Sequence, residues 1–418
     1  MRESVRPLLA ACAVALAWFL AIAPAAQAPE TIAFRGARLL TAAGPDIPDG
    51  VLLITGGKIA AAGPRGQVEI PSGARVVDAK GKTITPGLID AHSHIGLGAS
   101  GGETEDNEGS DPATPQLRVI DSIHPDGMAP DIDQFKSAAA EGVTAVIARP
   151  GSGNVIGGQS ALLKLRGGTV DDMVLRFPCD MKMALGRKTG YAVKGQMPTT
   201  KMGAAFLVRK AMAEAADYQR ALQRYEKEKG AKPDAEPPAR DLAKEAMLKV
   251  LNRELPVHVH VATADDIMTA VRLGEEFNFL RLSLVHAEEA WKVAATLAER
   301  HVAVVVGPVM VTYDDENHAI NLAQALQQKG VEVSITTDAD VVQQPFLRFQ
   351  AAVAVKHGMD PAEALKAVTI NPARVAGAEQ RIGSLEAGKD ADFVVFDGDP
   401  FDIQSRVLDV FIDGRRVR

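Results

Sequence analysis

The chain alternates short, continuous apolar runs with helical segments, and this rhythm restricts the fold more than any other feature. Val302–Val306 is apolar at every position, which is typical of a strand covered on both faces. Asp360 and Pro361 form a capped helix start. Eight segments are expected to be strands: Thr83–Asp90, Val143–Ala148, Ala161–Leu165, Met181–Ala184, Pro256–Val261, Arg281–Val285, Val302–Val306 and Glu332–Thr337. Strands and helices that alternate in this way predict an α/β chain built around a parallel (β/α)8 TIM barrel.

The two ends of the chain show a different pattern. Short alternating runs broken by Gly and Pro extend from Thr31 to Val77 and return after Gly383, which indicates small antiparallel sheets. Each end is too small to bury a core alone, so we expect both ends to join in one β-sandwich. The predicted divisions are a β-sandwich from 29–82 and 378–418, and a barrel over 83–377 with a helical insertion at about 191–255.

The first 28 residues have the features of a targeting segment. Arg2 and Arg6 give a positive start, Leu8–Ile22 is apolar, and Ala26–Ala28 fits a signal-peptidase site. The residues before Cys12 resemble a lipobox, but little apolar sequence precedes them, so lipidation is the weaker alternative. The prediction is a secreted or periplasmic protein with no membrane anchor after signal removal.

The amino-acid composition limits the kinds of molecule that the protein is expected to bind. The 418-residue chain is 46% apolar and 24% charged, as in ordinary soluble proteins. Its net charge is −7 and no dense basic patch is present, so no nucleic-acid partner is expected. Two cysteines are too few for a thiolate zinc site, and no structural disulfide is expected. We therefore expect a small-molecule substrate, and formation of a homo-oligomer stays open.

The stretch from Thr83 to Gly96 reads T-I-T-P-G-L-I-D-A-H-S-H-I-G and carries the strongest chemical signal. In an extended backbone, His92 and His94 project from the same face, with Cα atoms about 6–7 Å apart. Two imidazoles at this spacing suit one metal ion. Two solvated histidines on an edge strand are the alternative, but further His and Asp residues follow other expected strands.

The segment P-G-L-I-D-A-H-S-H resembles the first barrel strand of the amidohydrolase superfamily, in particular its imidazolonepropionase-like and prolidase-like branch. The segment G-S-L-E-A-G-K-D-A-D-F-V-V-F-D, from Gly383 to Asp397, resembles the C-terminal signature of the same superfamily. The likeness extends from about residue 31 to the end. It implies a metal-dependent hydrolase with a barrel and a small β domain.

The resemblance also implies the remaining ligands. His260 and His286 match the ligands of the fifth and sixth strands, and His258 is expected to be packed beneath them. Asp338 matches the eighth-strand aspartate, which binds metal and carries a proton during catalysis. Lys182 lies where relatives carry a carbamylated lysine that bridges two ions. A salt bridge between Lys182 and a buried acid is the alternative.

Substrate contacts are less well marked. The Gly-rich segment after the second strand includes Arg149 and Asn154, and it suits a carboxylate or phosphate, although it lacks a phosphate-loop pattern. Arg187 and Tyr191 follow the fourth strand, and His318 is expected close to the catalytic face. We treat these five residues as candidate substrate contacts.

These residues together predict an exported hydrolase that cleaves a carbon–nitrogen bond in an amide, a cyclic amide or a dipeptide-like compound. The expected cofactor is Zn²⁺, one or two ions, with other divalent metals as alternatives. Zinc polarises a carbonyl and lowers the pKa of bound water to about 7. A deaminase on the same frame and a metal-binding barrel without turnover are the alternatives. Ala339 favours the last, because relatives commonly carry a histidine after the aspartate.

Overall fold

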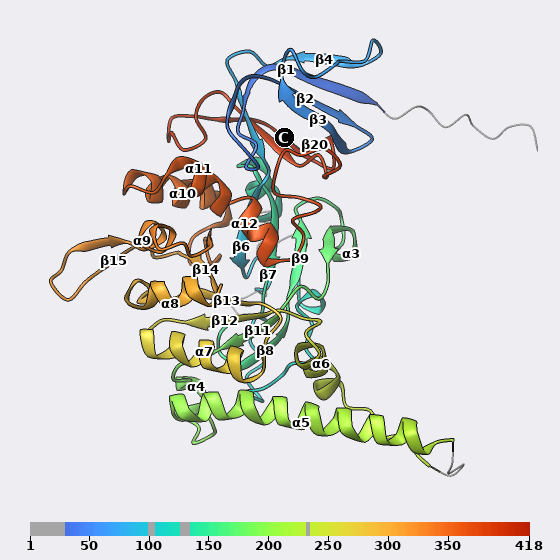
Figure 1. Ribbon diagram of the computed structural model, residues 1–418, viewed down its shortest axis with the longest axis vertical. Coiled ribbons are helices and arrows are strands. Elements are labelled where there is room, and N and C mark those ends of the chain that lie inside the picture. The colour runs from blue at the N-terminus through green and yellow to red at the C-terminus, as the bar shows by residue number, and fades with distance from the viewer. Residues whose placement is uncertain (1–29, 99–104, 126–133, 231–234) are drawn as a thin grey trace, which may run out of the picture.

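The computed structural model describes residues 30–98, 105–125, 134–230 and 235–418. The predicted signal segment and Cys12 lie outside these residues. Within the described ranges, no helix combines the length and the apolar character needed to cross a membrane. Figure 1 shows a molecule with a β-rich end, a mixed middle part and one long helix, α5, at the opposite end.

The β-rich end is one sheet to which both ends of the chain contribute. Its strand order is β20-β19-β18-β5-β1-β2-β3, and β4 pairs with β1. The strands are β1 (Thr31–Leu39), β2 (Ile47–Thr55), β3 (Lys58–Pro64), β4 (Arg75–Asp78), β5 (Thr83–Pro86), β18 (Phe393–Phe396), β19 (Val407–Ile412) and β20 (Arg415–Arg416). Because β18 pairs antiparallel with β5, the predicted joining of the two chain ends is confirmed.

Aromatic packing closes the core of this end sheet. The Phe34 and Phe393 rings are 5.2 Å apart edge to face, and Phe393 stacks on Phe411 with the ring centroids 4.5 Å apart. All three side chains are buried. Such aromatic pairs add about 0.5–1.5 kcal/mol each beyond the burial of their area. Residues from the two ends of the sequence therefore form one core.

The middle part contains two further ladders. A four-stranded sheet has the order β10-β9-β7-β6, and a six-stranded sheet has the order β17-β14-β13-β12-β11-β8. The strands are β6 (Leu88–Ser93), β7 (Val143–Ala148), β8 (Ile156–Gln159), β9 (Ala161–Lys164), β10 (Val174–Arg176), β11 (Met181–Ala184), β12 (Val257–Val261), β13 (Leu282–His286), β14 (Ala303–Val306) and β17 (Val333–Ile335). The expected strand positions agree closely with these, and the chain is a mixed α/β protein.

Two strand predictions are wrong in part. The segment Thr83–Asp90 is expected as one barrel strand, but Pro86 and Gly87 divide it into β5, in the end sheet, and β6, which pairs with β7. The third strand is expected to be parallel to its neighbours, but β9 pairs antiparallel with β7 and β8 antiparallel with β11. Among the described residues, no helix lies between β7 and β9, whereas parallel neighbours are usually joined by a helical crossover of a dozen or more residues.

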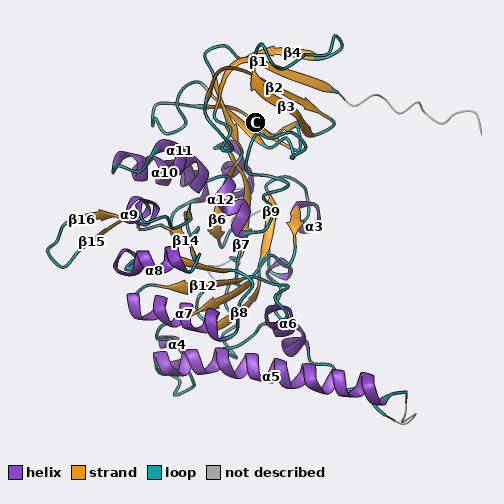
Figure 2. Ribbon diagram, in the orientation of Figure 1, coloured by secondary structure: helices purple, strands orange, loops and turns teal. Residues whose placement is uncertain are grey.

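The helices cover the parallel strands on one side, where α7, α8, α9 and α10 follow one another along the molecule (Figure 2). The helices are α2 (Gln134–Ala140), α3 (Val170–Met173), α4 (Thr189–Ala192), α5 (Lys201–Glu228), α6 (Leu242–Leu251), α7 (Ala264–Glu276), α8 (Ala294–Glu299), α9 (Leu322–Gln328), α10 (Leu347–Lys356), α11 (Pro361–Ala367) and α12 (Ile370–Val375). Short 3-10 turns are η1 (Val119–Asp121), η2 (Ala290–Val293) and η3 (Gln344–Phe346), and the hairpin β15 (Val311–Tyr313)–β16 (Ala319–Asn321) projects from this side.

The predicted helix signals correspond to observed caps. Asp360 Oδ1 accepts hydrogen bonds from the backbone N–H groups of Ala362 and Glu363, at 2.9 and 3.2 Å. Asp265 and Asp266 lie in the first turn of α7, where acidic side chains are favoured. The helical insertion consists of α5 and α6. These helices do not contribute strands, so the ladder passes directly from β11 to β12.

A cluster of buried charges connects the end sheet to the middle part. Lys164, at the end of β9, places its Nζ 2.8 Å from Asp390 Oδ2 and 2.9 Å from Asp392 Oδ2, and it also pairs with Asp413. Lys58 and Arg381 pair with Asp390 from the outside. The carboxylates belong to the C-terminal segment, so these ion pairs hold the two parts of the fold together.

Candidate metal centre

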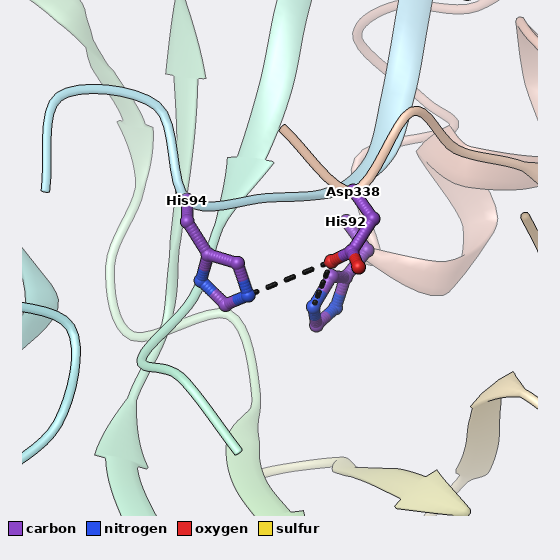
Figure 3. A group of neighbouring side chains, drawn as sticks. All are labelled: His92, His94 and Asp338. Atoms are coloured by element: carbon purple, nitrogen blue, oxygen red, sulfur yellow. Dashed lines mark ion pairs between the residues drawn. The ribbon is translucent and has the colours of Figure 1, made fainter. Parts of the chain in front are cut away.

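The side chains of His92, His94 and Asp338 converge on one point, although the two histidines are far from the aspartate in the sequence (Figure 3). Asp338 Oδ1 lies 3.5 Å from His92 Nε2 and 3.6 Å from His94 Nε2. The potential ligand atoms of these three residues all lie within 4.8 Å of one another. His92 is on β6, and Asp338 follows β17. The structure therefore brings together two predicted histidines and an aspartate that is 244 positions beyond His94 in the sequence.

Hydrogen bonds between backbone and side chains hold the ends of β6 and β17 together. Asp90 Oδ2 accepts from the Thr337 backbone N–H at 3.0 Å, from Thr337 Oγ1 at 2.6 Å and from Gln344 Nε2. Asp90 Oδ1 accepts from the His92 backbone N–H at 3.1 Å. Burial raises the pKa of Asp90, although these donors oppose the shift. Asp90 therefore fixes both strands that carry the candidate ligands.

Two of the candidate ligands have left-handed backbone conformations. Asp338 has φ of 50° and His286 has φ of 63°. Non-glycine residues with positive φ are uncommon, and they concentrate at functional sites. His286 ends β13, and Asp338 follows β17 after Thr336 and Thr337. Both residues therefore lie near the C-terminal ends of parallel strands, which is where barrel enzymes keep their chemistry.

The hydrogen bonds of the histidines define how their rings face the centre. His94 Nδ1 lies 2.8 Å from the Arg149 carbonyl oxygen, and His286 Nδ1 lies 2.7 Å from the Gly307 carbonyl oxygen. A carbonyl oxygen accepts only, so each Nδ1 must carry the proton and donate. Each Nε2 then presents a lone pair. His286 Nε2 lies 3.8 Å from Asp338 Oδ2.

This arrangement fits a cation. Burial lowers the pKa of His92, His94 and His260, the last to about 2, so the imidazoles are neutral at pH 7. His92 Nε2 and Asp338 Oδ1 are buried and have no hydrogen-bond partner among the described residues. Neutral imidazole nitrogens that face a carboxylate without a proton between them form an electron-rich centre. Such a donor set suits a divalent metal ion, with Zn²⁺ typical for nitrogen and oxygen ligands.

His260 and His286 extend this centre. Their ring centroids are 4.6 Å apart, and the His286 ring is 6.0 Å from the His92 ring. His260 Nδ1 is buried without a partner in the part of the chain that the structure describes. The two rings thus lie beside the first three candidate ligands and offer nitrogen donors for the same ion or for a second one.

His258 lies beneath His92 and not in the centre, as the strand register predicts. His258 Nε2 is 3.1 Å from His92 Nδ1, and His258 Nδ1 is 2.7 Å from Ser283 Oγ. Both His92 and His258 are fully buried. If Nδ1 of His92 donates to His258, the Nε2 lone pair of His92 faces Asp338. His258 is thereby a positioning residue for a ligand.

Lys182 is fully buried on β11, and its Nζ contacts a backbone carbonyl and a hydroxyl group. Nζ lies 3.2 Å from the Pro150 carbonyl oxygen and 3.2 Å from Ser152 Oγ. Burial, followed by the charge of Arg149, lowers the pKa of Lys182 to about 7. Lys182 Nζ has these two oxygen contacts and forms no ion pair with a carboxylate of the described residues. The predicted bridging role stays a prediction.

A cavity of about 530 Å³ opens beside His260. Three of the predicted substrate contacts, Asn154, Arg187 and Tyr191, line it. Asn154 and Tyr191 are largely buried and paired with each other, since Tyr191 Oη lies 2.7 Å from Asn154 Oδ1. Arg187 is exposed. These two pairing residues shape the cavity wall, and Arg187 offers a charge at its edge.

The other two predicted substrate contacts are placed differently. Arg149 has no exposed surface, and its guanidinium pairs with Asp180 at 2.6 Å and donates to the Ala91 carbonyl oxygen. Its donors are used inside the protein, so a substrate does not reach it. His318 lies between β15 and β16, its side chain is exposed, and it pairs with Asp314 at 3.1 Å. Neither residue lines the cavity beside His260.

Sequence reasoning missed several supporting residues. Asp90 stands two positions before His92 inside an apolar strand, where an isolated acid is costly unless it is bonded. That cost was the available signal for its role. Gln344 and Ser283 carry no such signal, because their partners are distant in the sequence.

A second group of potential metal ligands consists of three aspartates and differs from the candidate metal centre. Asp390, Asp392 and Asp413 also place carboxylate oxygens within 4.8 Å of one another. However, Lys164 Nζ lies among them and already supplies the positive charge. We therefore interpret this cluster as a structural ion-pair network.

The fold and site define a class of α/β proteins with a candidate metal centre near the ends of parallel strands. The profile of the Amidohydrolase family matches residues 83–417. The chain therefore belongs to the Amidohydrolase family, and it is an enzyme of the class that acts on carbon–nitrogen bonds. This confirms the family resemblance of the first-strand and C-terminal motifs.

Individual relatives agree with this membership. The chain is 31% identical to "Amidohydrolase tasK" of Hapsidospora irregularis over 374 residues, which is 83% of this chain but only 37% of that relative. It is 26% identical to an imidazolonepropionase of Sphingopyxis alaskensis over 401 residues, covering 89% of this chain and 93% of the relative. The crystal structure of an amidohydrolase from Thermotoga maritima has a TM-score of 0.84 and 36% identity, with 93% of this chain and 99% of that chain covered. This likeness implies a TIM-barrel-type fold with an additional domain.

Proposed function

We propose that this protein is an exported, metal-dependent hydrolase that cleaves amide, cyclic amide or dipeptide-like bonds. The observation that carries the proposal is the convergence of His92, His94 and Asp338, with His92 Nε2 and Asp338 Oδ1 buried and unpartnered. Membership of the Amidohydrolase family supports it. Export is inferred from the targeting pattern of residues 1–28.

His92, His94 and Asp338 are proposed to hold a zinc ion. His260 and His286 complete the site, with Lys182 as a bridging group if two ions bind. When bound, the metal polarises a carbonyl oxygen and acidifies a water molecule. The finer architecture that we propose is a closed (β/α)8 barrel with β8–β9 as its irregular strand, and a β-sandwich formed by the end sheet.

Asp338 is the only candidate ligand that is suited to move a proton during the reaction. Asp338 is mostly buried, and its carboxylate faces Nε2 of His92 and of His94. These imidazoles are neutral and carry no proton at Nε2. In the proposed reaction, Asp338 takes a proton from the attacking water as the new C–O bond forms. It then delivers that proton to the leaving nitrogen as the C–N bond breaks, which yields a carboxylic acid and an amine.

A product analysis tests this proposal. The purified protein, loaded with Zn²⁺, is incubated with N-acyl amino acids, dipeptides and cyclic imides and, in a separate series, with an aromatic amine. The released amines, acids and ammonia are quantified. For N-acyl amino acids and dipeptides, the expected result is release of an amine and a carboxylic acid in equal amounts, and for a cyclic imide it is a single ring-opened product with one new carboxylic acid. A chelator should abolish either reaction, and added metal should restore it. Ammonia release from an aromatic amine would instead identify a deaminase, and no turnover of any compound by the metal-loaded protein would contradict the proposal.

A further inference from the structure

The cavity beside His260 contains a buried lysine that the proposed reaction does not use. Lys188 directly precedes α4, and its residue surface is only 7% exposed. Its Nζ donates to the Ser152 carbonyl oxygen at 2.8 Å. An ammonium group has three donors, and this is its one hydrogen bond to the described residues. Two donors of a largely buried cation therefore lack a protein acceptor.

No carboxylate of the described residues forms an ion pair with Lys188. Asp266 also lines the cavity, but Asp266 Oδ2 already accepts from Lys201 Nζ and from Thr263 Oγ1, both at 2.9 Å. Burial lowers the pKa of Lys188 to about 8, and Asp266 only partly offsets this shift. A buried charge without a partner is costly, so the position favours a ligand that supplies the missing negative charge.

The charges of the described residues that line the cavity also favour a negatively charged ligand. Arg187, Lys188 and Lys194 are the cationic residues among them, and Asp266 is the one acid. His260 lines the same cavity and is neutral at pH 7. The cavity thus has a positive potential, which attracts anionic ligands.

Ser152 connects Lys188 to Lys182, the lysine beside the candidate metal centre. Its hydroxyl oxygen lies 3.2 Å from Lys182 Nζ, and its carbonyl oxygen accepts from Lys188 Nζ. The side chains of Lys182 and Lys188 therefore both contact Ser152. A ligand that reaches from the metal centre past His260 would bring a terminal group to Lys188.

We propose that Lys188 binds a carboxylate of the substrate, so that the cavity selects amides bearing a free acid, such as N-acyl amino acids and dipeptides, over neutral amides. This inference rests on the proposed function and narrows its substrate class. A lysine binds a carboxylate as a point charge through a charge-assisted hydrogen bond. Lys188 is thus a specificity-determining residue and does not take part in bond cleavage.

Matched pairs of compounds test the inference without any substitution. N-acetyl amino acids and the corresponding N-acetyl amino acid carboxamides differ only in the terminal charge. For the zinc-loaded protein we measure kcat and KM for each pair, and we measure the shift in melting temperature that each compound causes. The acids are expected to have the lower KM and to cause the larger shift. Equal values for acid and carboxamide would overturn the inference while leaving the proposed hydrolase function intact.

Variants then locate the effect. Lys188→Met is expected to raise KM for the acids by about 10- to 100-fold, because it removes a hydrogen bond to a charged group. The same variant should leave KM for the carboxamides unchanged, and Lys188→Arg should retain the preference for acids. Lys194→Met is the matched control, since Lys194 lines the same cavity but is exposed, and it should change KM at most about fivefold.

The outcomes separate the two proposals. If Lys188→Met binds metal normally and loses affinity equally for acids and carboxamides, Lys188 has a structural role and the inference is wrong. If the zinc-loaded wild type hydrolyses neither class but acids still raise the melting temperature more than carboxamides, the anion site stands and the hydrolase function fails. If neither class is hydrolysed and neither shifts the melting temperature, both proposals fail.

Discussion

His258 Nε2 lies 3.1 Å from Nδ1 of His92, and both imidazoles are fully buried. Since His258 also contacts Ser283 Oγ through Nδ1, one chain of hydrogen bonds extends from β13 to the candidate metal centre. The partner of the remote nitrogen sets the tautomer and the orientation of a metal-binding histidine. His258 therefore contributes to metal binding without being a ligand.

Replacement of His258 should weaken metal binding. We expect His258→Phe to lower the affinity for Zn²⁺ by about 10- to 100-fold, the usual effect of losing such a partner. His258→Gln keeps a hydrogen-bond acceptor and should recover part of the loss. Competition with a chromogenic chelator measures the affinity, and His357→Phe, at an exposed helix end, is the control. Unchanged affinity in His258→Phe would show that His92 is oriented by other contacts.

Asp90 should contribute strongly to stability. Its carboxylate accepts hydrogen bonds from Thr337 and Gln344 as well as from the backbone of His92. Asp90→Ala leaves these buried donors unpaired, and we expect it to lower the free energy of unfolding by about 2–4 kcal/mol. Urea denaturation gives the value. Asp49→Ala removes an exposed acid in a long ion pair and should have almost no effect, so a similar loss in both variants would contradict this role of Asp90.

The Lys164 network should make stability depend on pH. Burial raises the pKa of Asp390, but hydrogen bonds from Arg381, Lys164 and Lys58 outweigh burial and hold the pKa below its ordinary value of 3.8. A carboxyl group with a lowered pKa in the folded state stabilises the protein above the ordinary value, and this contribution is lost as the pH falls. The ion pairs of Asp390 thus stabilise the fold at neutral pH and lose effect below about pH 4.

Lys164→Met tests this network. The variant leaves buried carboxylates without their central partner, so we expect a loss of about 3–5 kcal/mol at pH 7. The difference from the wild type should narrow as the pH falls and the carboxylates become protonated. Lys58→Met is the matched control, because Lys58 pairs with the same Asp390 from a half-exposed position. An equal loss in both variants, or a difference that does not change with pH, would argue against the network.

We predict that the state of Lys182 decides how many metal ions bind. A carbamylated Lys182 offers two oxygens in place of a buried positive charge, and two ions about 3.5–4 Å apart could share them. We expect two metal ions per chain when bicarbonate is supplied, and one ion per chain in Lys182→Ala. Elemental analysis of protein prepared with and without bicarbonate measures the ratio. A ratio of one under every condition would establish a mononuclear site.

The sequence predicts those parts of the fold and site that depend on local patterns. The positions of β7 and β11 agree residue for residue with the expected strands, because each is a short and mainly apolar segment. The convergence of His92 and His94 follows from the alternation of side chains along an extended strand. The place of His258 below His260 follows from the same alternation in β12, whereas its contact with His92 joins two strands and was not predicted.

Features that depend on distant partners were not predictable. The sequence suggests that Arg149 contacts the substrate. The structure shows that Arg149 instead forms an ion pair with Asp180, which neutralises its charge. His318 lies in a hairpin whose direction no local pattern defines. The antiparallel course of β8 and β9 depends on the absence of a helix in the preceding loop, which a series of apolar runs does not reveal.

The central claim is that Asp338, with His92 and His94, holds the metal ion, and the metal content of two neighbouring aspartate variants tests it most directly. Asp338→Ala removes a buried carboxylate at the centre, whereas Asp340→Ala removes an exposed carboxylate two positions further along. After exposure to limiting Zn²⁺ and gel filtration, zinc per chain is measured for both variants and for the wild type. We predict that Asp340→Ala retains the wild-type content and that Asp338→Ala loses most of it, with both variants folded by circular dichroism. Full zinc content in folded Asp338→Ala would contradict the proposed site.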